Sequence, residues 1–360
     1  MPISRSSALS LAFDPLFLEH RSRGYHPERP ERLEAARRGI DRCAAEGARL
    51  VPLPPRDATD EEILRAHDPT YFAQLLGLAG HHAALDADTY LAPASVAAAR
   101  RAAGGAIALA TALLDAREGE PGEPRQGFAL LRPPGHHATR DQGMGFCLLN
   151  NVAIAAYAAL ERGASRVAIV DWDVHHGNGT QNIFWTDDRV LFISLQEAPL
   201  YPGTGGVREQ GEGRGLGFTI NVPLPASATD AVYRLAFEQV VLPALRRYAP
   251  ALILVSAGFD GHARDPLASM QLSEAGYAWM ARALREVADE TAGGRLGLVL
   301  EGGYDLTAIE ESARASVHGA LGWEVAEVTG EVPARHHEAI EAARLAVETL
   351  RGVEALPGAR

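Results

Sequence analysis

The chain has no lysine, and all 34 of its basic residues are arginine. This absence excludes enzymes that form a Schiff base on a lysine and phosphate-binding loops that depend on one. Positive charge is also in short supply overall, because the formal net charge is −12. Such a balance argues against a standing nucleic-acid or anionic-membrane partner, since both attract basic faces.

Cysteine is equally scarce, with only Cys43 and Cys147. Two cysteines are too few for a disulfide framework or a thiolate metal cage. The apolar stretch from Leu9 to Phe13 is too short for the core of a signal peptide. We expect no run to approach the ~20 apolar residues of a membrane helix. These absences predict a cytoplasmic protein with no membrane partner.

The sequence is rich in apolar segments that alternate between strand and helix patterns. With 360 residues and 47% hydrophobic content, it can bury a large core. Strands are predicted at 9–13, 50–53, 128–131, 167–170, 190–195, 218–222, 251–255 and 296–300. Helices are predicted at 30–47, 60–65, 69–78, 95–116, 151–162, 232–248 and 273–292, with a surface loop at 118–126. This alternation predicts an α/β fold with a doubly wound, mainly parallel sheet of about eight strands flanked by helices. We expect a single domain over 1–360, in which 331–360 forms a C-terminal helical extension.

Polar residues gather directly after the predicted strand at 167–170. Within eight positions the chain carries two carboxylates, two imidazoles and an amide, namely Asp171, Asp173, His175, His176 and Asn178. Unpaired buried charges cost several kcal/mol or shift their pKa until they are neutral, so packing alone does not explain this cluster. Carboxylate and imidazole at a strand exit are typical of a catalytic divalent-metal site.

A second strand exit supplies a further candidate ligand, Asp260. Ligands of parallel α/β sheets bind beyond the carboxyl ends of the strands, where Asp173, His175 and Asp260 are expected to meet. Taken alone, Asp260 in Gly-Phe-Asp-Gly is better explained as a turn residue, and the first cluster is what favours a ligand. An Asp-His-Asp set leaves a position open for water and suits zinc or Fe(II), which the sequence does not separate.

The pair His136-His137 follows a rigid Pro-Pro-Gly turn. Neighbouring residues on a regular strand point to opposite faces, so a pair that serves one pocket needs such a loop. Two imidazoles beside a metal-bound water can act as general base and general acid. Asp171 and Asn178 are candidate partners for the two rings, which would make one ring more cationic than the other. His176 is expected to be structural rather than a ligand.

Three aromatic residues follow other strand exits. Tyr304 comes after Gly302-Gly303, where a phenol could donate a hydrogen bond to a developing oxyanion. Phe146 and Tyr201 are candidates for the walls of a narrow apolar channel. The other histidine pairs, at 81–82 and 336–337, lie in helical patterns, and we expect them to face solvent.

With these residues in place, the chain resembles the zinc-dependent histone deacetylase family, in its class II-like branch, which includes acetylpolyamine amidohydrolases. The matching stretches occur in the family's order and span about residues 10 to 325. They are His26–Leu33, Arg132–His137, Gly145–Cys147, Asp171–Thr180, Ser256–Asp260 and Glu301–Tyr304. The resemblance implies an arginase-like α/β fold, in agreement with the predicted sheet.

The resemblance also implies a role for each site residue. It places one zinc ion on Asp173, His175 and Asp260. It makes His137, partnered by Asn178, the general base and then the general acid, and His136, partnered by Asp171, an electrostatic helper. It makes Tyr304 the group that polarises the acyl carbonyl. Substrate would be held by the Gly145 carbonyl between Phe146 and Tyr201, although many relatives have Phe where Tyr201 stands.

Potassium is the second cofactor that the resemblance implies. Its ligands would be Asp171, Asp173, His175, Ser194 and Leu195, behind the zinc. A second potassium site would fall near Phe184 and Val190. Both ions would be structural.

The substrate is predicted to be an acylated lysine of a protein or peptide. Relatives specialised for acetylpolyamines resemble one another in carrying Glu after the Asp-Pro that follows the last ligand, and this chain has Leu267 there. The alternatives are an acetylpolyamine deacetylase, an arginase-type two-metal hydrolase and an acyl-lysine binding protein without turnover. The two-metal enzyme is disfavoured because it needs a second ligand set, and the second strand exit supplies only Asp260. The binding protein is disfavoured because it would not need Tyr304 together with both histidines. A homo-oligomer is compatible with the sequence.

Overall fold

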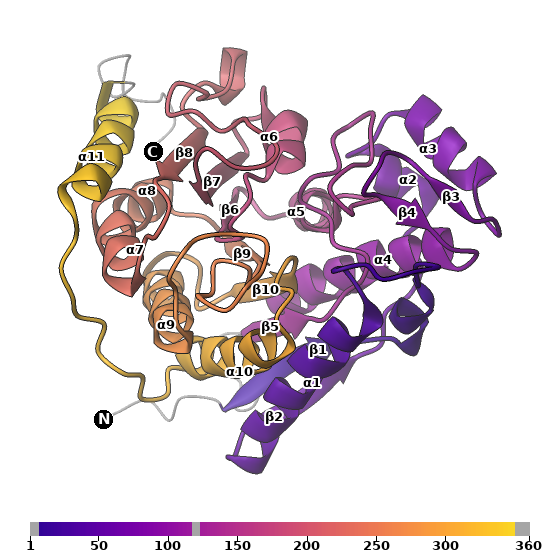
Figure 1. Ribbon diagram of the computed structural model, residues 1–360, viewed down its shortest axis with the longest axis horizontal. Helices are drawn as coiled ribbons and strands as arrows, with labels where there is room; N and C mark the ends of the chain where they lie inside the picture. The colour runs from indigo at the N-terminus through magenta and orange to yellow at the C-terminus, as the bar shows by residue number, and fades with distance from the viewer. Residues whose placement is uncertain (1–6, 117–122, 350–360) are drawn as a thin grey trace.

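The computed structural model describes residues 7–116 and 123–349 (Figure 1). Part of the predicted loop at 118–126 and residues 350–360 of the predicted C-terminal extension lie outside the described residues.

The core is an eight-stranded sheet in which every neighbouring pair is parallel. Its strands are β1 (Ala8–Ala12), β2 (Arg49–Leu53), β5 (Gln126–Ala129), β6 (Val167–Asp171), β7 (Val190–Glu197), β8 (Thr219–Leu224), β9 (Leu252–Ala257) and β10 (Leu296–Leu300). They lie in the order β2-β1-β5-β10-β9-β6-β7-β8. The predicted parallel sheet is confirmed. A separate two-stranded ribbon joins β3 (Ala83–Ala84) to β4 (Tyr90–Leu91).

The burial of the strands explains their sequence pattern. Every residue of β6, β9 and β10 is buried, which matches strands covered on both faces and apolar throughout. The edge strand β2 instead has exposed residues at both Arg49 and Pro52. Strand β5 begins and ends two residues earlier than the predicted 128–131, so the chain already leaves the sheet at Leu130 and Leu131.

Helices cover the sheet in two layers (Figure 1). One layer contains α4 (Ser95–Asp115), α5 (Asn151–Glu161) and α6 (Asn178–Phe184). The other contains α1 (Pro30–Ala45), α10 (Leu306–Leu321), α9 (Glu274–Thr291), α8 (Leu242–Tyr248) and α7 (Asp230–Ala236), the last two joined by a π-helical turn at Phe237–Val241. Helices α2 (Asp60–Leu64) and α3 (Pro69–Gly77) precede the ribbon in the chain, and α11 (Ala334–Thr349) packs on β8.

Two α-helices of the described residues are absent from the sequence prediction. The short α6 begins inside the polar cluster that follows β6. The longer α10 has clear signals at both ends: the Asp305 side chain accepts from the N–H of Ala308 (2.7 Å), and Gly322 ends the helix at φ 72°. Because α10 starts right after Tyr304, it anchors the loop that carries this residue.

Helix α4 corrects the expectation about membrane-length segments. It has 21 residues with a mean hydropathy of 1.2 in its best window, so it passes a membrane test by length and composition. However, 67% of that window is buried inside the fold, where α4 packs on α5 and on strands β1, β5, β9 and β10. A helix that is apolar nearly all round and enclosed in this way is a core helix.

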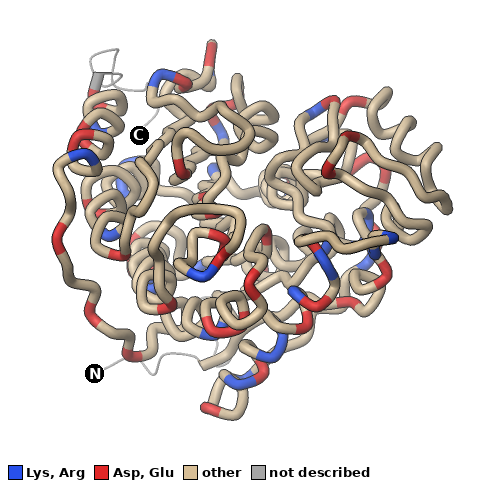
Figure 2. The backbone as a smooth tube through the Cα atoms, in the orientation of Figure 1, with Lys and Arg blue, Asp and Glu red and all other residues tan. Residues whose placement is uncertain are grey.

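The surface carries charges of both signs. Figure 2 shows arginines interspersed with aspartates and glutamates rather than gathered by sign. Of the histidines expected in solvent, His81, His82 and His337 are exposed. The expectation for His336 is wrong: its side chain, in the first turn of α11, is fully buried, with Nε2 3.1 Å from the carbonyl oxygen of Pro225.

Candidate active site

The predicted site residues converge at the carboxyl edge of four adjacent strands. Strands β5, β10, β9 and β6 are neighbours in the sheet, so the loops that leave their carboxyl ends meet. These loops carry His136 and His137 after β5, Tyr304 after β10, Asp260 after β9, and the segment from Asp171 to Asn178 after β6.

Asp173, His175 and Asp260 form a compact cluster of metal-binding groups. The His175 Nδ1 atom lies 3.2 Å from Asp173 Oδ1 and 3.2 Å from Asp260 Oδ2. Both carboxylates are buried. Ligand atoms of a tetrahedral zinc ion, at bonds of ~2.0–2.1 Å, are about 3.3 Å apart. The spacing of the three side chains therefore suits one small divalent ion.

Backbone amides hold the two carboxylates from behind. The Gly302 N–H donates to Asp173 Oδ2 (2.8 Å), and the Val174 N–H donates to Asp260 Oδ1 (2.9 Å). A Cβ atom at Gly302 would lie 2.0 Å from Asp260 Oδ2, so no larger residue fits at that position. Such outer contacts fix the orientation of metal ligands.

The charge balance of this cluster also matches a cation site. Burial by itself would lower the pKa of His175, but its hydrogen bonds to Asp173 and Asp260 outweigh burial and raise the pKa to about 10. Burial raises the pKa of Asp260, and the nearby charge of Asp173 raises it further. Two carboxylates that repel each other around one imidazole are neutralised when a divalent cation lies between them.

The paired histidines lie beside this cluster with different partners. His136 Nδ1 is 3.0 Å from Asp171 Oδ2, and His137 Nδ1 is 2.7 Å from Asn178 Oδ1. The two rings lie 4.0 Å apart between centroids. Both partners are those named from the sequence.

The two rings differ in charge because of these surroundings. Burial opposes the charge on His136, but Asp173 and Asp171 outweigh it and raise its pKa well above the usual value. Burial lowers the pKa of His137, and His136 and His175 lower it further. His136 is therefore the cationic ring and His137 the neutral ring, and a neutral imidazole can accept a proton.

Tyr304 closes the other side of the site. Its side chain is largely buried, and the Arg32 guanidinium lies 4.7 Å above its ring. Its backbone N–H donates to Asp265 Oδ2 (2.6 Å). Burial raises the pKa of the phenol well above its usual value, so the hydroxyl keeps its proton.

Phe146 and Tyr201 lie on two sides of the approach to the site. The Phe146 ring is 5.9 Å from the Tyr304 ring, and the Tyr201 ring, 40% exposed, is 5.1 Å from the ring of His137. Gly145 and Phe146 both have positive φ, at 55° and 70°. A Cβ atom at Gly145 would lie 2.4 Å from His137 Cδ2, so glycine is needed there for both conformation and space.

The loop at 86–93 supports Phe146, although the sequence of this loop did not indicate such a role. Thr89 Oγ1 accepts the N–H of Phe146 (3.1 Å), and the His26 ring packs edge-on against Phe146 at 4.8 Å. His26 Nε2 in turn is 3.1 Å from the carbonyl oxygen of Asp88. Leu267, named from the sequence as a specificity residue, is half-buried, and its N–H donates to Asp265 Oδ1 (3.0 Å).

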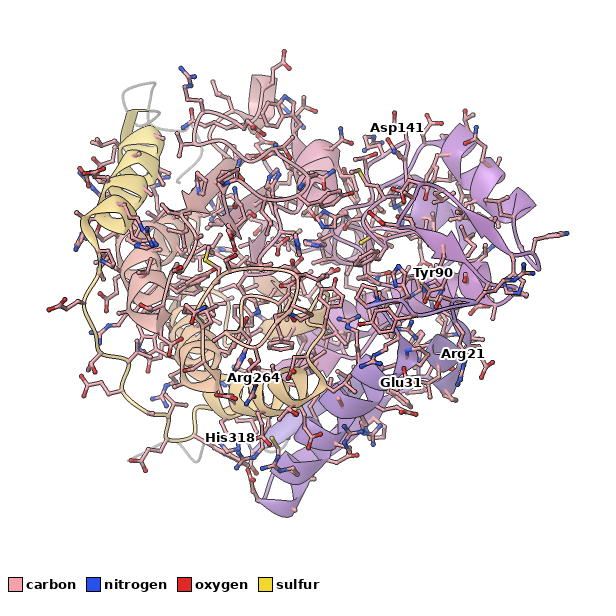
Figure 3. All side chains as sticks on the ribbon, in the orientation of Figure 1. Arg21, Glu31, Tyr90, Asp141, Arg264 and His318 are labelled. Atoms are coloured by element: carbon pink, nitrogen blue, oxygen red, sulfur yellow. The ribbon has the colours of Figure 1, made fainter. Side chains whose placement is uncertain are left out.

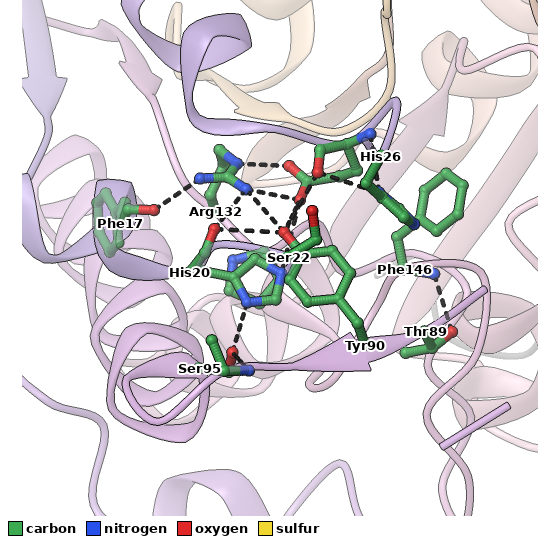
Figure 4. A network of polar contacts seen from close by, with 12 residues as sticks. Phe17, His20, Ser22, His26, Thr89, Tyr90, Ser95, Arg132 and Phe146 are labelled. Carbon is green, nitrogen blue, oxygen red and sulfur yellow. Dashed lines mark hydrogen bonds and ion pairs between the residues drawn. The ribbon is translucent and has the colours of Figure 1, made fainter. Parts of the chain in front are cut away.

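A buried ionic network lies beneath the site and was not anticipated from the sequence (Figure 4). Glu28 binds Arg32 through Oε1 (2.9 Å) and Arg132 through both oxygens (2.5 and 2.7 Å), and all three side chains are fully buried. Tyr90 and the stacked ring of His20 complete it. Arg32 lies in the first turn of α1, and Arg132 precedes the histidine loop, so one carboxylate joins two segments of the site.

We expect Glu28→Gln to be strongly destabilising. Removal of the carboxylate charge leaves two buried guanidinium groups without their shared counter-ion, which costs about 3–5 kcal/mol. Chemical denaturation of the metal-free protein measures this loss. The matched control is Glu290→Gln, which breaks the exposed pair with Arg246 and is expected to cost at most ~1 kcal/mol. Equal losses in the two variants would contradict the importance of the buried network.

One other group of metal-capable side chains occurs among the described residues. Cys43, Glu46 and His318 approach one another at the end of α10 that is remote from Tyr304 (Figure 3). The Arg314 guanidinium already binds Glu46 Oε1 at 2.6 Å, and burial raises the pKa of Cys43 to about 12. Because Glu46 is already paired with Arg314 and the Cys43 thiol stays protonated, this group is a poor metal site.

The fold and the site define a class of protein: an α/β protein with an eight-stranded parallel sheet and a candidate metal site beyond the carboxyl ends of its strands. Among solved structures, the chain is similar to the HD domain of HDA15, with a TM-score of 0.85 and 34% identity, over 98% of this chain and 100% of that one. The histone deacetylase domain family matches residues 26–320. The chain belongs to the histone deacetylase family.

Several named relatives agree with this assignment. A probable deacetylase of Archaeoglobus fulgidus is 42% identical over 82% of this chain and 81% of its own length. A histone deacetylase-like amidohydrolase of Pseudomonas aeruginosa is 44% identical over 78% of this chain and 72% of its own. Histone deacetylase 15 of Arabidopsis thaliana is 39% identical over 89% of this chain, which spans only 58% of that protein.

Proposed function

We propose that this protein is a zinc-dependent deacylase that hydrolyses the amide of acetylated, or otherwise acylated, lysine side chains. The observation that carries the proposal is the cluster of Asp173, His175 and Asp260, in which His175 Nδ1 lies 3.2 Å from an oxygen atom of each carboxylate, beside a charged and a neutral histidine. Membership of the histone deacetylase family supports the same reaction.

The chain's own residues supply the rest of the chemistry. Zinc held by the three ligands would supply a Lewis acid and a water of lowered pKa. The neutral His137, oriented by Asn178, accepts the proton of the attacking water, and a histidine returns a proton to the leaving amine. The cationic His136, held by Asp171, stabilises the negative charge that develops. The Tyr304 hydroxyl donates a hydrogen bond to the acyl oxygen.

The substrate enters between Phe146 and Tyr201. These two aromatic walls suit the apolar methylene stem of a lysine side chain, and the Gly145 carbonyl is the proposed acceptor for the substrate amide N–H. Burial raises the pKa of Tyr201, and the charges of Asp86 and Asp88 also raise it. The two aspartates thus bring negative charge to the entrance, which favours a positively charged substrate.

A structural potassium ion is also proposed, behind the zinc ligands. Ser194 lies directly opposite Asp171 in the pairing of β7 with β6. Its Oγ atom is buried and has no hydrogen-bond partner among the described residues. An oxygen atom left without a partner in this way is suited to a cation that prefers oxygen ligands. Ser194 and Leu195, with Asp171, Asp173 and His175, are the proposed ligands.

The experiment that tests the substrate is acetate release by the zinc-loaded protein from an acetyl-lysine peptide and from an acetylpolyamine. We expect the peptide to be preferred, because Leu267 offers no carboxylate to a second ammonium group. Glu in place of Leu267 is expected to raise the relative rate with the polyamine. A polyamine preference in the unmodified protein would make it a small-molecule deacetylase instead. Zinc binding without release from either substrate would favour an acyl-lysine binding protein.

A further inference from the structure

Glu301 belongs to the motif that ends in Tyr304, but the proposed chemistry gives it no task. It is the first residue after β10, and its side chain is fully buried behind the site. Burying a carboxylate costs free energy that only specific contacts offset. Its contacts therefore show what the carboxylate does at this position.

The Glu301 side chain binds the histidine loop. Its Oε2 atom accepts the N–H of Gly135 (2.6 Å) and the N–H of His136 (3.1 Å). This reach across the sheet is possible because β10 and β5 are direct neighbours, with Val299 opposite Ala129. One oxygen atom thus satisfies two consecutive amides of a loop that has left the sheet and has no strand partner.

The Glu301 backbone holds the tyrosine loop at the same time. Its N–H donates to the Ala257 carbonyl (3.2 Å), and its carbonyl accepts from Arg32 Nη2 (2.6 Å). Tyr304 follows three positions later. The residue therefore links the loop that carries His136 and His137 to the loop that carries Tyr304, from opposite sides of the proposed reaction centre.

The other carboxylate oxygen shows that packing alone does not explain the residue. Glu301 Oε1 is buried and has no hydrogen-bond partner among the described residues. An apolar side chain of similar volume would avoid this unsatisfied oxygen. What it would lose is the acceptor for the Gly135 and His136 amides.

We propose that Glu301 is a positioning residue: its Oε2 atom sets the distance between the histidine pair and Tyr304 by holding the amides of residues 135 and 136. The expected effect of Glu301 on catalysis rests on the proposed function. The hydrogen bonds between Glu301 and the amides of residues 135 and 136 do not depend on that function. Glu301 is not among the proposed metal ligands or substrate contacts, and it acts through the loop.

Two substitutions separate the acceptor from the negative charge. Glu301→Met keeps the volume and removes both oxygens. Glu301→Gln keeps one carbonyl oxygen for the two amides and loses the charge. We expect the Met variant to lose about 10- to 100-fold in kcat, because a small displacement of catalytic groups has an effect of that size. We expect KM and zinc content to stay within about threefold in both variants, and kcat of the Gln variant to stay close to that of the original protein.

Hydrogen exchange provides a readout that does not depend on turnover. In the metal-free protein, the amides of Gly135 and His136 should exchange at least about tenfold faster in the Met variant than in the original protein, and at nearly the original rate in the Gln variant. If the Met variant does not fold, Glu301→Asp, which withdraws the oxygen by one methylene, replaces it in the same comparison.

The matched control is Gln126→Met on the same pair of strands. Gln126 is a buried amide at the opposite end of β5, where its Nε2 donates to the Gly294 carbonyl (2.8 Å). This variant also loses a buried hydrogen bond between a side chain and the backbone, although here the side chain is the donor. We expect kcat of this variant and the exchange of residues 135 and 136 to be unchanged. Unchanged exchange in the Glu301→Met variant would overturn the proposal, as would equal losses of kcat in the Met and Gln variants. Absence of deacylation in the original protein would reject the proposed function and leave the exchange test standing.

Discussion

Asp173→Ala is expected to abolish both metal binding and deacylation. The substitution removes the carboxylate whose Oδ1 lies 3.2 Å from His175 Nδ1 and leaves two of the three donors. It also removes the acceptor of the Gly302 amide, which lies in the tyrosine loop. The measurements are the zinc content of protein purified from zinc-supplemented medium and the release of acetate from an acetyl-lysine peptide.

Glu46→Ala is the control for this experiment. It also replaces a carboxylate of a metal-capable group by alanine, but its loss affects only the pairs with Arg314 and His318. We expect one zinc ion per chain and full activity in this variant. Stoichiometric zinc in Asp173→Ala would show that the ligand set is wrong, and a lost ion in Glu46→Ala would point to the remote cluster instead.

Tyr304→Phe is expected to reduce kcat by about 10²–10³-fold, the usual cost of removing one donor to a developing oxyanion. The aromatic ring remains, so the contact with the Arg32 guanidinium at 4.7 Å and the contact with Phe146 are kept. The fold, the zinc content and KM should therefore change little. Steady-state kinetics with the preferred substrate, together with zinc analysis, measure these effects.

Tyr201→Phe is the matched control, because it removes the hydroxyl of the other tyrosine near the histidines. The Tyr201 ring is partly exposed at the entrance. We expect kcat of the Tyr201→Phe variant to stay within a few fold of the value for the original protein. A Tyr304→Phe variant with nearly normal kcat would remove this phenol from the reaction. A large loss in Tyr201→Phe would move the donor role to the channel wall.

The sheet was predictable because its strands are short and apolar at consecutive positions. Strand β6 is buried throughout, so its sequence shows both its conformation and its place in the middle of the sheet. Strand β5 starts two residues before the predicted segment, at Gln126, because the amide of Gln126 is buried and hydrogen-bonded although it is polar. Helix α10 was missing from the prediction, although Asp305 and Gly322 mark its ends in the sequence.

The candidate site was predictable where polar residues interrupt an apolar pattern at a strand exit. That pattern indicated the residues, but it could not indicate their partners across the fold. Glu28 and Arg132 are 104 positions apart and both fully buried, contrary to the usual exposure of their residue types. His336 shows the same limit, because its burial depends on how α11 packs against β8.

The strand order has a consequence for synthesis. Strand β10, the last strand in the described part of the chain, lies between β5 and β9 in the middle of the sheet. Until the ribosome has released it, the nascent chain can form only two partial sheets, β2-β1-β5 and β9-β6-β7-β8, each with an open apolar edge. Such edges expose unpaired backbone groups and favour aggregation.

Insertion of β10 joins these halves and delivers Glu301 and Tyr304 to the site in the same event. A partly synthesised chain therefore has neither a complete core nor a complete reaction centre, even when all three metal ligands are already present. Chaperone protection is expected to matter most in the interval between the synthesis of β9 and the release of β10.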